Sequence, residues 1–350
     1  MQTKVVIKNA VINGTLTDLT VLDGKIAHIG PTDEAGIDCG GHTLRAGLID
    51  IHTHGCYGMD TMDAPVSELA LRYAANGVTS FLPTTMTAPL EDLLRVCGQA
   101  TPTEGAHVLG YHLEGPYLAE GAKGAQNGDH LRAPDVTEFL SLPNVAMVTL
   151  APELDGADAL IETSPAVVCI GHTQADYDVC TRAIQKGAKC LTHTCNAMPP
   201  FHHRAPGPIG AALDGGIYAQ VISDGIHIHP SVVRALYRLF GADRMVLISD
   251  SMRATGLPDG TYDLGGQEMT VQGGIARTPD GALAGSTATL LDCVRAAISF
   301  GIPADDAFRM ASATPAHLLG VNKGFLKVGY DADFILLDDE NTLIKTMIFS

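Results

Sequence analysis

The stretch Gly47-Leu48-Ile49-Asp50-Ile51-His52-Thr53-His54-Gly55 decides the fold, because it is a short apolar run that ends in two histidines. Side chains alternate along a strand, so both imidazoles are expected on one side of it. Further Val-, Ile- and Leu-rich runs follow at 78–82, 108–111, 145–150, 166–170, 189–192, 218–222 and 244–248. Near-continuous apolar runs are typical of parallel strands that are buried on both faces.

Segments with helical spacing separate most of these runs. The clearest of them lie at 66–76, 89–99, 174–186 and 231–240. Eight strands that alternate with helices predict an α/β fold of the (β/α)8 barrel type. A doubly wound parallel sheet is the alternative, but no Gly-rich phosphate-binding fingerprint follows the first run.

The two ends of the chain resemble each other and differ from the middle. Short β-branched runs near the N-terminus are joined by Asn13-Gly14 and Asp23-Gly24, which are hairpin signals. Similar runs recur near the C-terminus, at 326–329, 332–337 and 343–348. Neither end is long enough for a stable sheet alone, so we expect them to pair. The expected organisation is a small β domain from 1–46 and 321–350, and a barrel from 47–320.

Charge and cysteine usage exclude several classes of protein. The chain has 22 Lys and Arg against 39 Asp and Glu, a net charge of −17, which argues against binding to nucleic acid or to an anionic membrane. No apolar run approaches the roughly 20 residues that span a bilayer. The eight cysteines are scattered without a Cys-x-x-Cys pair, the pattern of reduced thiols in a cytoplasmic protein.

Side chains that can bind a metal follow most of the predicted strands. In chain order they are His52, His54, His112, Glu114, His172, His193, His227 and Asp250. In a barrel the carboxyl ends of all strands meet at one face, where active sites lie. A lone histidine is more often a surface or packing residue, and we interpret His28, His42, His107, His130 and His317 in that way. So many ligand-type groups at one end favour a metal site with nitrogen and oxygen ligands.

Residues 47–55 resemble the first-strand signature of the amidohydrolase superfamily. Further motifs narrow the resemblance to the N-acetylglucosamine-6-phosphate deacetylase family; they lie at 112–117, 193–198, 202–207, 224–227, 249–250 and 283–286. The resemblance covers essentially the whole chain, in order. That family combines a (β/α)8 barrel with a small β domain made from both chain ends, in agreement with the reading from the residues.

The resemblance implies a metal site. Glu114, His172 and His193 match the ligands of the family's primary metal, and His52 and His54 match the members that hold a second ion with Glu114 as the bridge. Asp250 matches the catalytic acid and base, close enough to the ions to be counted among the metal-binding residues. The implied cofactor is one or two divalent ions per subunit, with zinc expected first and iron, manganese or cobalt as alternatives.

The resemblance also implies a substrate site. The matching positions are Ala125, Gln126, Asn196, Ala197, Arg204, His227, Leu283, Ala284 and Gly285. Several of them face the phosphate in that family. The resemblance further implies a homodimer, and it leaves open whether Arg204 serves its own site or that of the neighbouring subunit.

The expected reaction is hydrolysis of N-acetylglucosamine 6-phosphate to glucosamine 6-phosphate and acetate. One alternative is a related amide hydrolase that acts on N-acetylgalactosamine 6-phosphate, an N-acetyl amino acid or a cyclic amide. Arg204 favours a phosphorylated substrate, because a phosphate needs a fixed cation on so acidic a protein. The other alternative is a non-catalytic sugar-phosphate-binding protein, against which Asp250 and the full ligand set argue.

Overall fold

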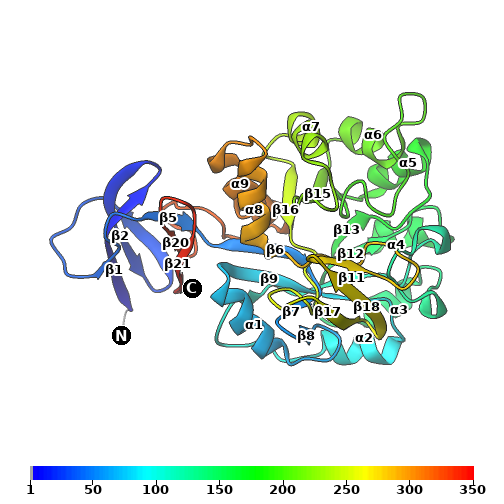
Figure 1. Ribbon diagram of the computed structural model, residues 1–350, viewed down its shortest axis with the longest axis horizontal. Coiled ribbons are helices and arrows are strands. Elements are labelled where there is room, and N and C mark those ends of the chain that lie inside the picture. The colour runs from blue at the N-terminus through cyan, green and yellow to red at the C-terminus, as the bar shows by residue number, and fades with distance from the viewer. Residues whose placement is uncertain (1–2) are drawn as a thin grey trace.

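The computed structural model describes residues 3–350 and confirms the predicted fold class (Figure 1). A barrel of parallel strands forms the larger part, and a small β sheet that holds both chain ends lies to one side of it. Each predicted apolar run contains or adjoins a barrel strand. These strands are β6 (Leu48–Thr53), β9 (Val78–Thr85), β11 (Tyr111–Glu114), β12 (Val145–Leu150), β13 (Val167–Ile170), β14 (Cys190–Leu191), β15 (Tyr218–Ile222) and β16 (Met245–Ile248).

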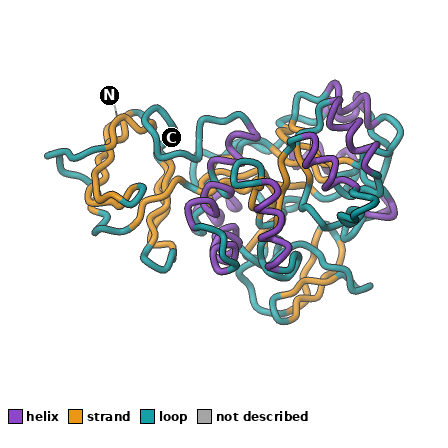
Figure 2. The backbone as a smooth tube through the Cα atoms, turned by 90° about the horizontal axis from the view of Figure 1, so that it is seen from above, coloured by secondary structure: helices purple, strands orange, loops and turns teal. Residues whose placement is uncertain are grey.

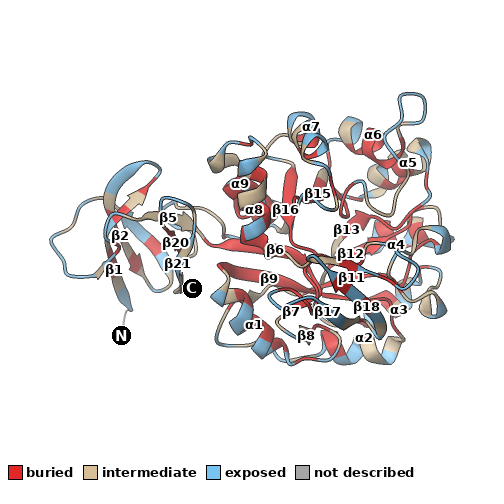
Figure 3. Ribbon diagram, viewed as in Figure 1, coloured by how far each residue is buried: buried red, intermediate tan, exposed pale blue. Residues whose placement is uncertain are grey.

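The barrel closes where its first and last strands meet. Strands β9 and β11 to β16 are hydrogen-bonded in chain order, and β6 pairs with β9. Just beyond β16, the Asp250 N–H donates to the His52 carbonyl at 3.0 Å, which ties the two ends of the sheet together. Figure 3 shows the strands as the most buried layer. Ile49, Leu82 and Met147 are among the side chains that fill the barrel interior.

Amphipathic helices cover the barrel. They are α1 (Val66–Ala75), α2 (Leu90–Cys97), α3 (Val136–Ser141), α4 (Ala157–Thr163), α5 (Tyr177–Lys186), α6 (Gly207–Gly215), α7 (Pro230–Phe240), α8 (Leu290–Ser299), α9 (Ala304–Met310) and α10 (Ala313–Leu319). Helix α7 is representative, because Val233, Leu236 and Phe240 are buried at a helical spacing while Val232 and Leu239 are exposed. The four helices expected from the sequence are all present, with ends that differ by up to three residues.

Both chain ends build the small sheet, as predicted. Its strands are β1 (Lys4–Ile12), β2 (Thr15–Leu22), β3 (Lys25–Ile29), β4 (Ile37–Asp38), β5 (Thr43–Ala46), β20 (Asp333–Leu337) and β21 (Leu343–Ile348). The predicted turns form, since Asn13 and Gly14 both have positive φ (49° and 77°), as a type I′ hairpin requires. The run at 326–329 is a loop, not a strand. Figure 2 shows the strands curling into a ring beside the barrel.

An insert after β16 reaches the open end of the barrel. It is the antiparallel sheet β17 (Gly260–Leu264), β18 (Gln267–Gln272) and β19 (Ile275–Arg277), which the sequence reading did not predict. Short elements complete the chain: β7 (Gly55–Cys56), β8 (Met59–Asp60), β10 (His107–Val108) and the 3-10 turns η1 (Glu120–Ala122) and η2 (Gly128–His130). Within residues 3–350, no helix combines the length and apolar character that a membrane crossing requires. The proposed domain limits stay a prediction.

Candidate metal centre and active site

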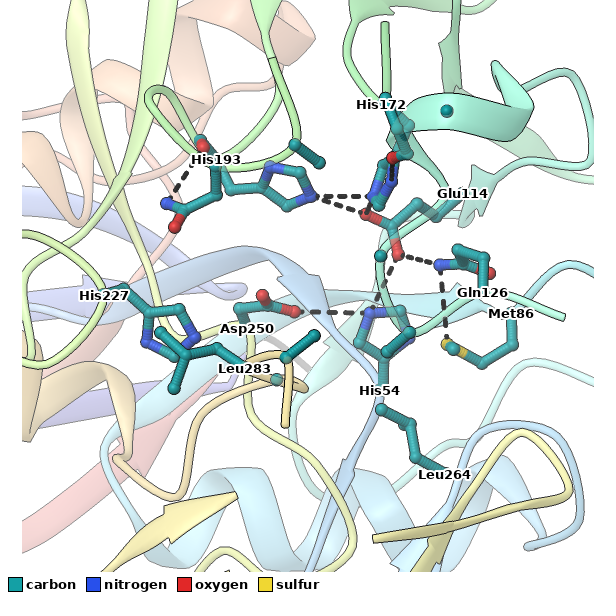
Figure 4. A pocket seen from close by; sticks show the side chains of 18 residues that line it. His54, Met86, Glu114, Gln126, His172, His193, His227, Asp250, Leu264 and Leu283 are labelled. Carbon is teal, nitrogen blue, oxygen red and sulfur yellow. Dashed lines mark hydrogen bonds and ion pairs between the residues drawn. The ribbon is translucent and has the colours of Figure 1, made fainter. Parts of the chain in front are cut away.

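Two groups of possible metal ligands lie at the carboxyl ends of the barrel strands and share one carboxylate (Figure 4). One group is His52, His54 and Glu114, and the other is Glu114, His172 and His193. In each group the candidate ligand atoms lie within 4.8 Å of one another, and all five residues are buried. His52 lies in β6 and His54 follows directly after it, so the alternation of side chains puts both on one side. The carboxyl ends of the other strands meet at the same face and bring their side chains to them.

The Glu114 carboxylate lies between the two histidine pairs. Its Oε1 is 3.0 Å from His193 Nε2 and 3.1 Å from His172 Nε2. Its Oε2 is 3.2 Å from His54 Nε2. A second carboxylate, that of Asp250, approaches from β16, with Oδ1 3.3 Å from His54 Nε2 and 3.5 Å from His52 Nε2. Glu114 Oε1 also lies 3.2 Å from His52 Nε2, so this carboxylate faces both histidine pairs, whereas Asp250 faces His52 and His54.

Hydrogen bonds on the far side of the rings fix which nitrogen faces the centre. His52 Nδ1 lies 3.0 Å from Gln220 Oε1, and His172 Nδ1 lies 2.9 Å from the Ala122 carbonyl oxygen. His54 Nδ1 is held in the same way by the carbonyl of Thr84, at 3.2 Å. Each Nδ1–H donates to an oxygen, so a ring in its neutral form presents its Nε2 lone pair to the centre. This arrangement is typical of histidines that bind a metal.

The converging atoms need a positive charge between them. His172 Nε2 and His193 Nε2 lie 3.0 Å apart, and both face the same oxygen of Glu114. Among residues 3–350, no atom meets the geometry of a hydrogen bond to the buried His52 Nε2, although Glu114 Oε1 lies 3.2 Å from it. Lone pairs and carboxylate oxygens repel one another unless a proton or a cation lies among them. The donor set of imidazole nitrogens and carboxylate oxygens therefore fits a divalent metal ion.

The pKa shifts at the site also favour a positive charge between the carboxylates. Burial opposes a charge on His54, but the carboxylates of Asp250 and Glu114 outweigh it and raise the pKa of His54 to about 10. Burial also raises the pKa of Glu114, yet His52 and His172 hold that pKa well below its usual range. The pKa of Asp250 is likewise lowered, because His52 and His54 outweigh burial. Both carboxylates are therefore ionised at neutral pH.

Among the strand-end histidines of the described chain, His112 and His227 lie outside both ligand groups. The Nε2 of His112 lies 2.8 Å from Thr149 Oγ1 and its Nδ1 lies 3.3 Å from Thr84 Oγ1, so hydroxyl groups hold both nitrogens. Burial and the neighbouring His52 lower the pKa of His112 well below its usual value. It is a neutral packing residue beneath the centre, and neither ligand group includes it.

A cavity of about 380 Å³ opens above the ligands. Seven of the nine predicted substrate positions line it: Ala125, Gln126, Asn196, Ala197, His227, Leu283 and Gly285. Two do not. Ala284 is buried beside Met252 in a separate apolar cluster. Arg204 is exposed on the loop after β14, where its Nη1 lies 2.6 Å from His203 Nε2.

His227 enters the cavity with its ring held from behind. Its Nδ1 lies 2.7 Å from Asp224 Oδ2, and Asp224 Oδ1 accepts the backbone N–H groups of Ile226 and His227, each at 2.9 Å. Burial lowers the pKa of His227, but the carboxylate of Asp224 outweighs it and raises the pKa above the usual value. The cavity therefore contains an imidazole that is ready to carry a positive charge.

The sequence reading missed several residues that shape the site. Met86 and Leu264 line the cavity, and Gln220 orients His52. Gln220 left a signal, since it is the one polar residue inside the apolar run 218–222 and a buried amide must find a partner. Met86 and Leu264 left none, because apolar residues at a cavity wall look like any other core residue.

Comparison with known proteins agrees with the geometry. Residues 43–350 match the Amidohydrolase family. The N-acetylglucosamine-6-phosphate deacetylase of Vibrio furnissii is 37% identical, over 96% of this chain and 88% of that protein. The N-acetylgalactosamine-6-phosphate deacetylase of Escherichia coli O157:H7 is 39% identical, over 91% of this chain and 90% of that protein. A solved structure, N-acetyl-D-glucosamine-6-phosphate deacetylase from Mycobacterium smegmatis in complex with N-acetyl-D-glucosamine-6-phosphate, is 32% identical with a TM-score of 0.89, covering 99% of this chain and 98% of that one. The chain therefore belongs to the amidohydrolase family.

Proposed function

We propose that this chain is a metal-dependent deacetylase that hydrolyses N-acetylglucosamine 6-phosphate to glucosamine 6-phosphate and acetate. The observation that carries the proposal is the Glu114 carboxylate between two histidine pairs, with Asp250 beside it, at the floor of a cavity of about 380 Å³. Two relatives, 37% and 39% identical to this chain over nearly its whole length, are named for this activity. A cavity of this volume suits a small ligand.

The proposed metal ligands are the two groups that share Glu114. Glu114, His172 and His193 would hold one divalent ion, and His52 and His54 would hold a second with Glu114 as the bridge. Zinc is our first choice, because imidazole and carboxylate ligands suit it, and iron, manganese and cobalt accept the same donors. When bound, such an ion acts as a Lewis acid that polarises a carbonyl group and makes water more acidic.

Asp250 is the proposed acid and base. Its lowered pKa leaves it ionised at neutral pH, so it can accept a proton from the water whose oxygen bonds to the acetyl carbonyl carbon. Asp250 then returns that proton to the sugar nitrogen as the C–N bond breaks, which releases acetate and the free amine. His227, held by Asp224, is placed to donate a hydrogen bond to the oxygen on which negative charge develops.

Arg204 is the proposed phosphate ligand, in a homodimer. It does not line the cavity of its own chain, and the exposed side chain of Phe201 lies on the same loop. An exposed arginine and an exposed aromatic residue on one loop suit a contact with a second copy of this chain. In the proposed homodimer, Arg204 would enter the cavity of that second copy. The eight free cysteines, seven of them buried, suit a reducing compartment, and we propose a cytoplasmic location.

A second candidate substrate is the galactosamine epimer, since the relative from Escherichia coli O157:H7 is named for it at 39% identity. Acetate release should be measured on both epimeric 6-phosphates and on both unphosphorylated sugars. We expect the highest kcat/KM on N-acetylglucosamine 6-phosphate. Faster hydrolysis of the other epimer would reassign the sugar. Activity on an N-acetyl amino acid or a cyclic amide that exceeds all four would refute the sugar deacetylase.

The role of Arg204 is tested with the same assay. Loss of a charge-assisted hydrogen bond costs about 1.5–3 kcal/mol, so Arg204→Ala should lower kcat/KM on the 6-phosphate by roughly one to two powers of ten. The unphosphorylated sugar should hardly be affected. An equal loss on both substrates would instead make Arg204 a structural residue.

A further inference from the structure

The side chain of Gln126 connects the first barrel strands to the bridging carboxylate. Its Oε1 accepts the backbone N–H of Thr87 at 2.7 Å, just beyond β9. Its Nε2 lies 2.6 Å from Glu114 Oε2, the oxygen that also faces His54 (Figure 4). Gln126 is only 3% exposed, so water does not compete freely for either bond.

The orientation of this amide is fixed by its partners. A backbone N–H can only donate, so the oxygen of Gln126 must face Thr87. The amide nitrogen must then face Glu114, and it donates to the carboxylate. The remaining contact of that nitrogen is with Met86 Sδ, a weak acceptor at 3.7 Å. The oxygen and the nitrogen of the Gln126 amide are therefore each bonded to the protein.

We infer that Gln126 is a positioning residue that sets the rotation of Glu114. This inference rests on the metal centre proposed above, and it gives Gln126 a role beside the sugar contact that the family resemblance implies for it. With Nε2 bound to Oε2, the carboxylate presents Oε1 to His172, His193 and His52, and Oε2 to His54. Rotation of the carboxylate would change which of its oxygens each of these histidines faces.

The expected effect follows from how such bonds act on metal ligands. Outer partners hold a ligand in the geometry that the ion requires, and their loss typically lowers metal affinity by about 10–100-fold. Glu114 belongs to both ligand groups, so loss of the Gln126 bond should weaken both. A residue that only contacts the sugar would change KM and leave metal affinity alone.

The test is Gln126→Met, which keeps the length of the side chain and removes the donor. The matched control is Gln267→Met, because Gln267 also donates to the same loop, at the Ala125 carbonyl 2.6 Å away, but is not hydrogen-bonded to Glu114. Each metal-loaded protein is titrated with a chromophoric chelator, and cobalt-substituted protein gives a visible spectrum of the ligand field. Thermal unfolding of the metal-free forms verifies folding, with Gln126→Leu as the replacement if the first variant does not fold.

We expect Gln126→Met to release metal to the chelator about 10–100-fold more readily than the wild type and to alter the cobalt spectrum. Gln267→Met should stay within about twofold. Unchanged metal affinity with a raised KM would overturn the inference in favour of a sugar contact. An equal loss of metal affinity in both variants would overturn the inference, because both substitutions would then act by disordering the loop. The titration uses no sugar, so a wrong deacetylase substrate leaves it valid, whereas a wild-type protein that binds no divalent ion would refute the metal centre itself.

Discussion

Asparagine in place of Asp250 keeps the size of the side chain and removes its ability to accept a proton. The contacts that hold this residue in the barrel are made by its backbone: its N–H donates to the His52 carbonyl at 3.0 Å, and its carbonyl accepts the Ser286 N–H at 2.7 Å. Both survive the substitution. The change is therefore confined to the carboxylate that faces His54 at 3.3 Å.

The magnitude follows from the role proposed for that carboxylate. A positioned acid or base contributes about 10²–10⁴-fold to a rate, or roughly 2.7–5.5 kcal/mol at 1.36 kcal/mol per tenfold. Asp250 takes part in both the attack of water and the departure of the amine, so its replacement should slow both steps. We expect kcat to fall by at least about 10²-fold.

The assay is acetate release by wild type and Asp250→Asn at equal metal content, with KM measured alongside. KM should change little, because the carboxylate takes part in proton transfer and is not proposed to bind the sugar. A variant with kcat within about tenfold of the wild type would refute the reasoning. The proton transfer would then belong to another group, and His227 would be the first to test.

Three further changes probe the site and the small sheet beside the barrel. Asp224→Asn removes the charge that raises the pKa of His227, so kcat/KM should fall about 10–100-fold and its alkaline limb should move to lower pH, as a pH profile would reveal. Burial raises the pKa of Asp333, but its hydrogen bonds and Lys323 lower it from 3.8 to about 2. That lowering of the pKa contributes about 2 kcal/mol, fully present above pH 4 and lost as the pH falls through about 2, so Asp333→Asn should cost about 2 kcal/mol in urea unfolding at pH 7 and less at pH 3. His172 has φ of 47°, so in metal-free protein His172→Gly should be more stable than His172→Ala by about 1 kcal/mol, whereas the reverse order would show an unstrained backbone.

The barrel could be predicted because its strands are buried on both faces and so appear as uninterrupted apolar runs. The run at 218–222 coincides with β15, and the run at 145–150 coincides with β12. The insert was missed although its signal was present: Gly265-Gly266 joins two alternating stretches, and both glycines adopt positive φ in the hairpin. A regular alternation of strands and helices gave no reason to expect a separate sheet there.

The candidate ligands could be predicted from their residue types and from their positions at strand ends, because these ends meet at one face of any such barrel. The groups that hydrogen-bond to these ligands could not be predicted. Gln220 reaches His52 across 168 residues of chain, and the Ala122 carbonyl reaches His172 across 50. A carbonyl oxygen leaves no trace in a sequence. His112 was grouped with the candidate ligands because it follows a predicted strand, and only the structure places it one layer deeper, between two threonine hydroxyls.

The backbone at the site departs from local preference. His172, His193 and Asp250 have φ of 47°, 23° and 49°, in the region that favours glycine. Glycine would adopt these angles without strain, but it would bring no imidazole and no carboxylate to the mouth of the barrel. A non-glycine residue there costs about 1–3 kcal/mol and persists only where the surrounding structure fixes it. Here the closed barrel does so, since the Asp250 N–H is held by the carbonyl of His52 on the opposite edge of the sheet. The closed barrel thus holds the backbone of these three residues in conformations that their residue types disfavour. Local sequence preferences alone would therefore not have predicted these backbone conformations.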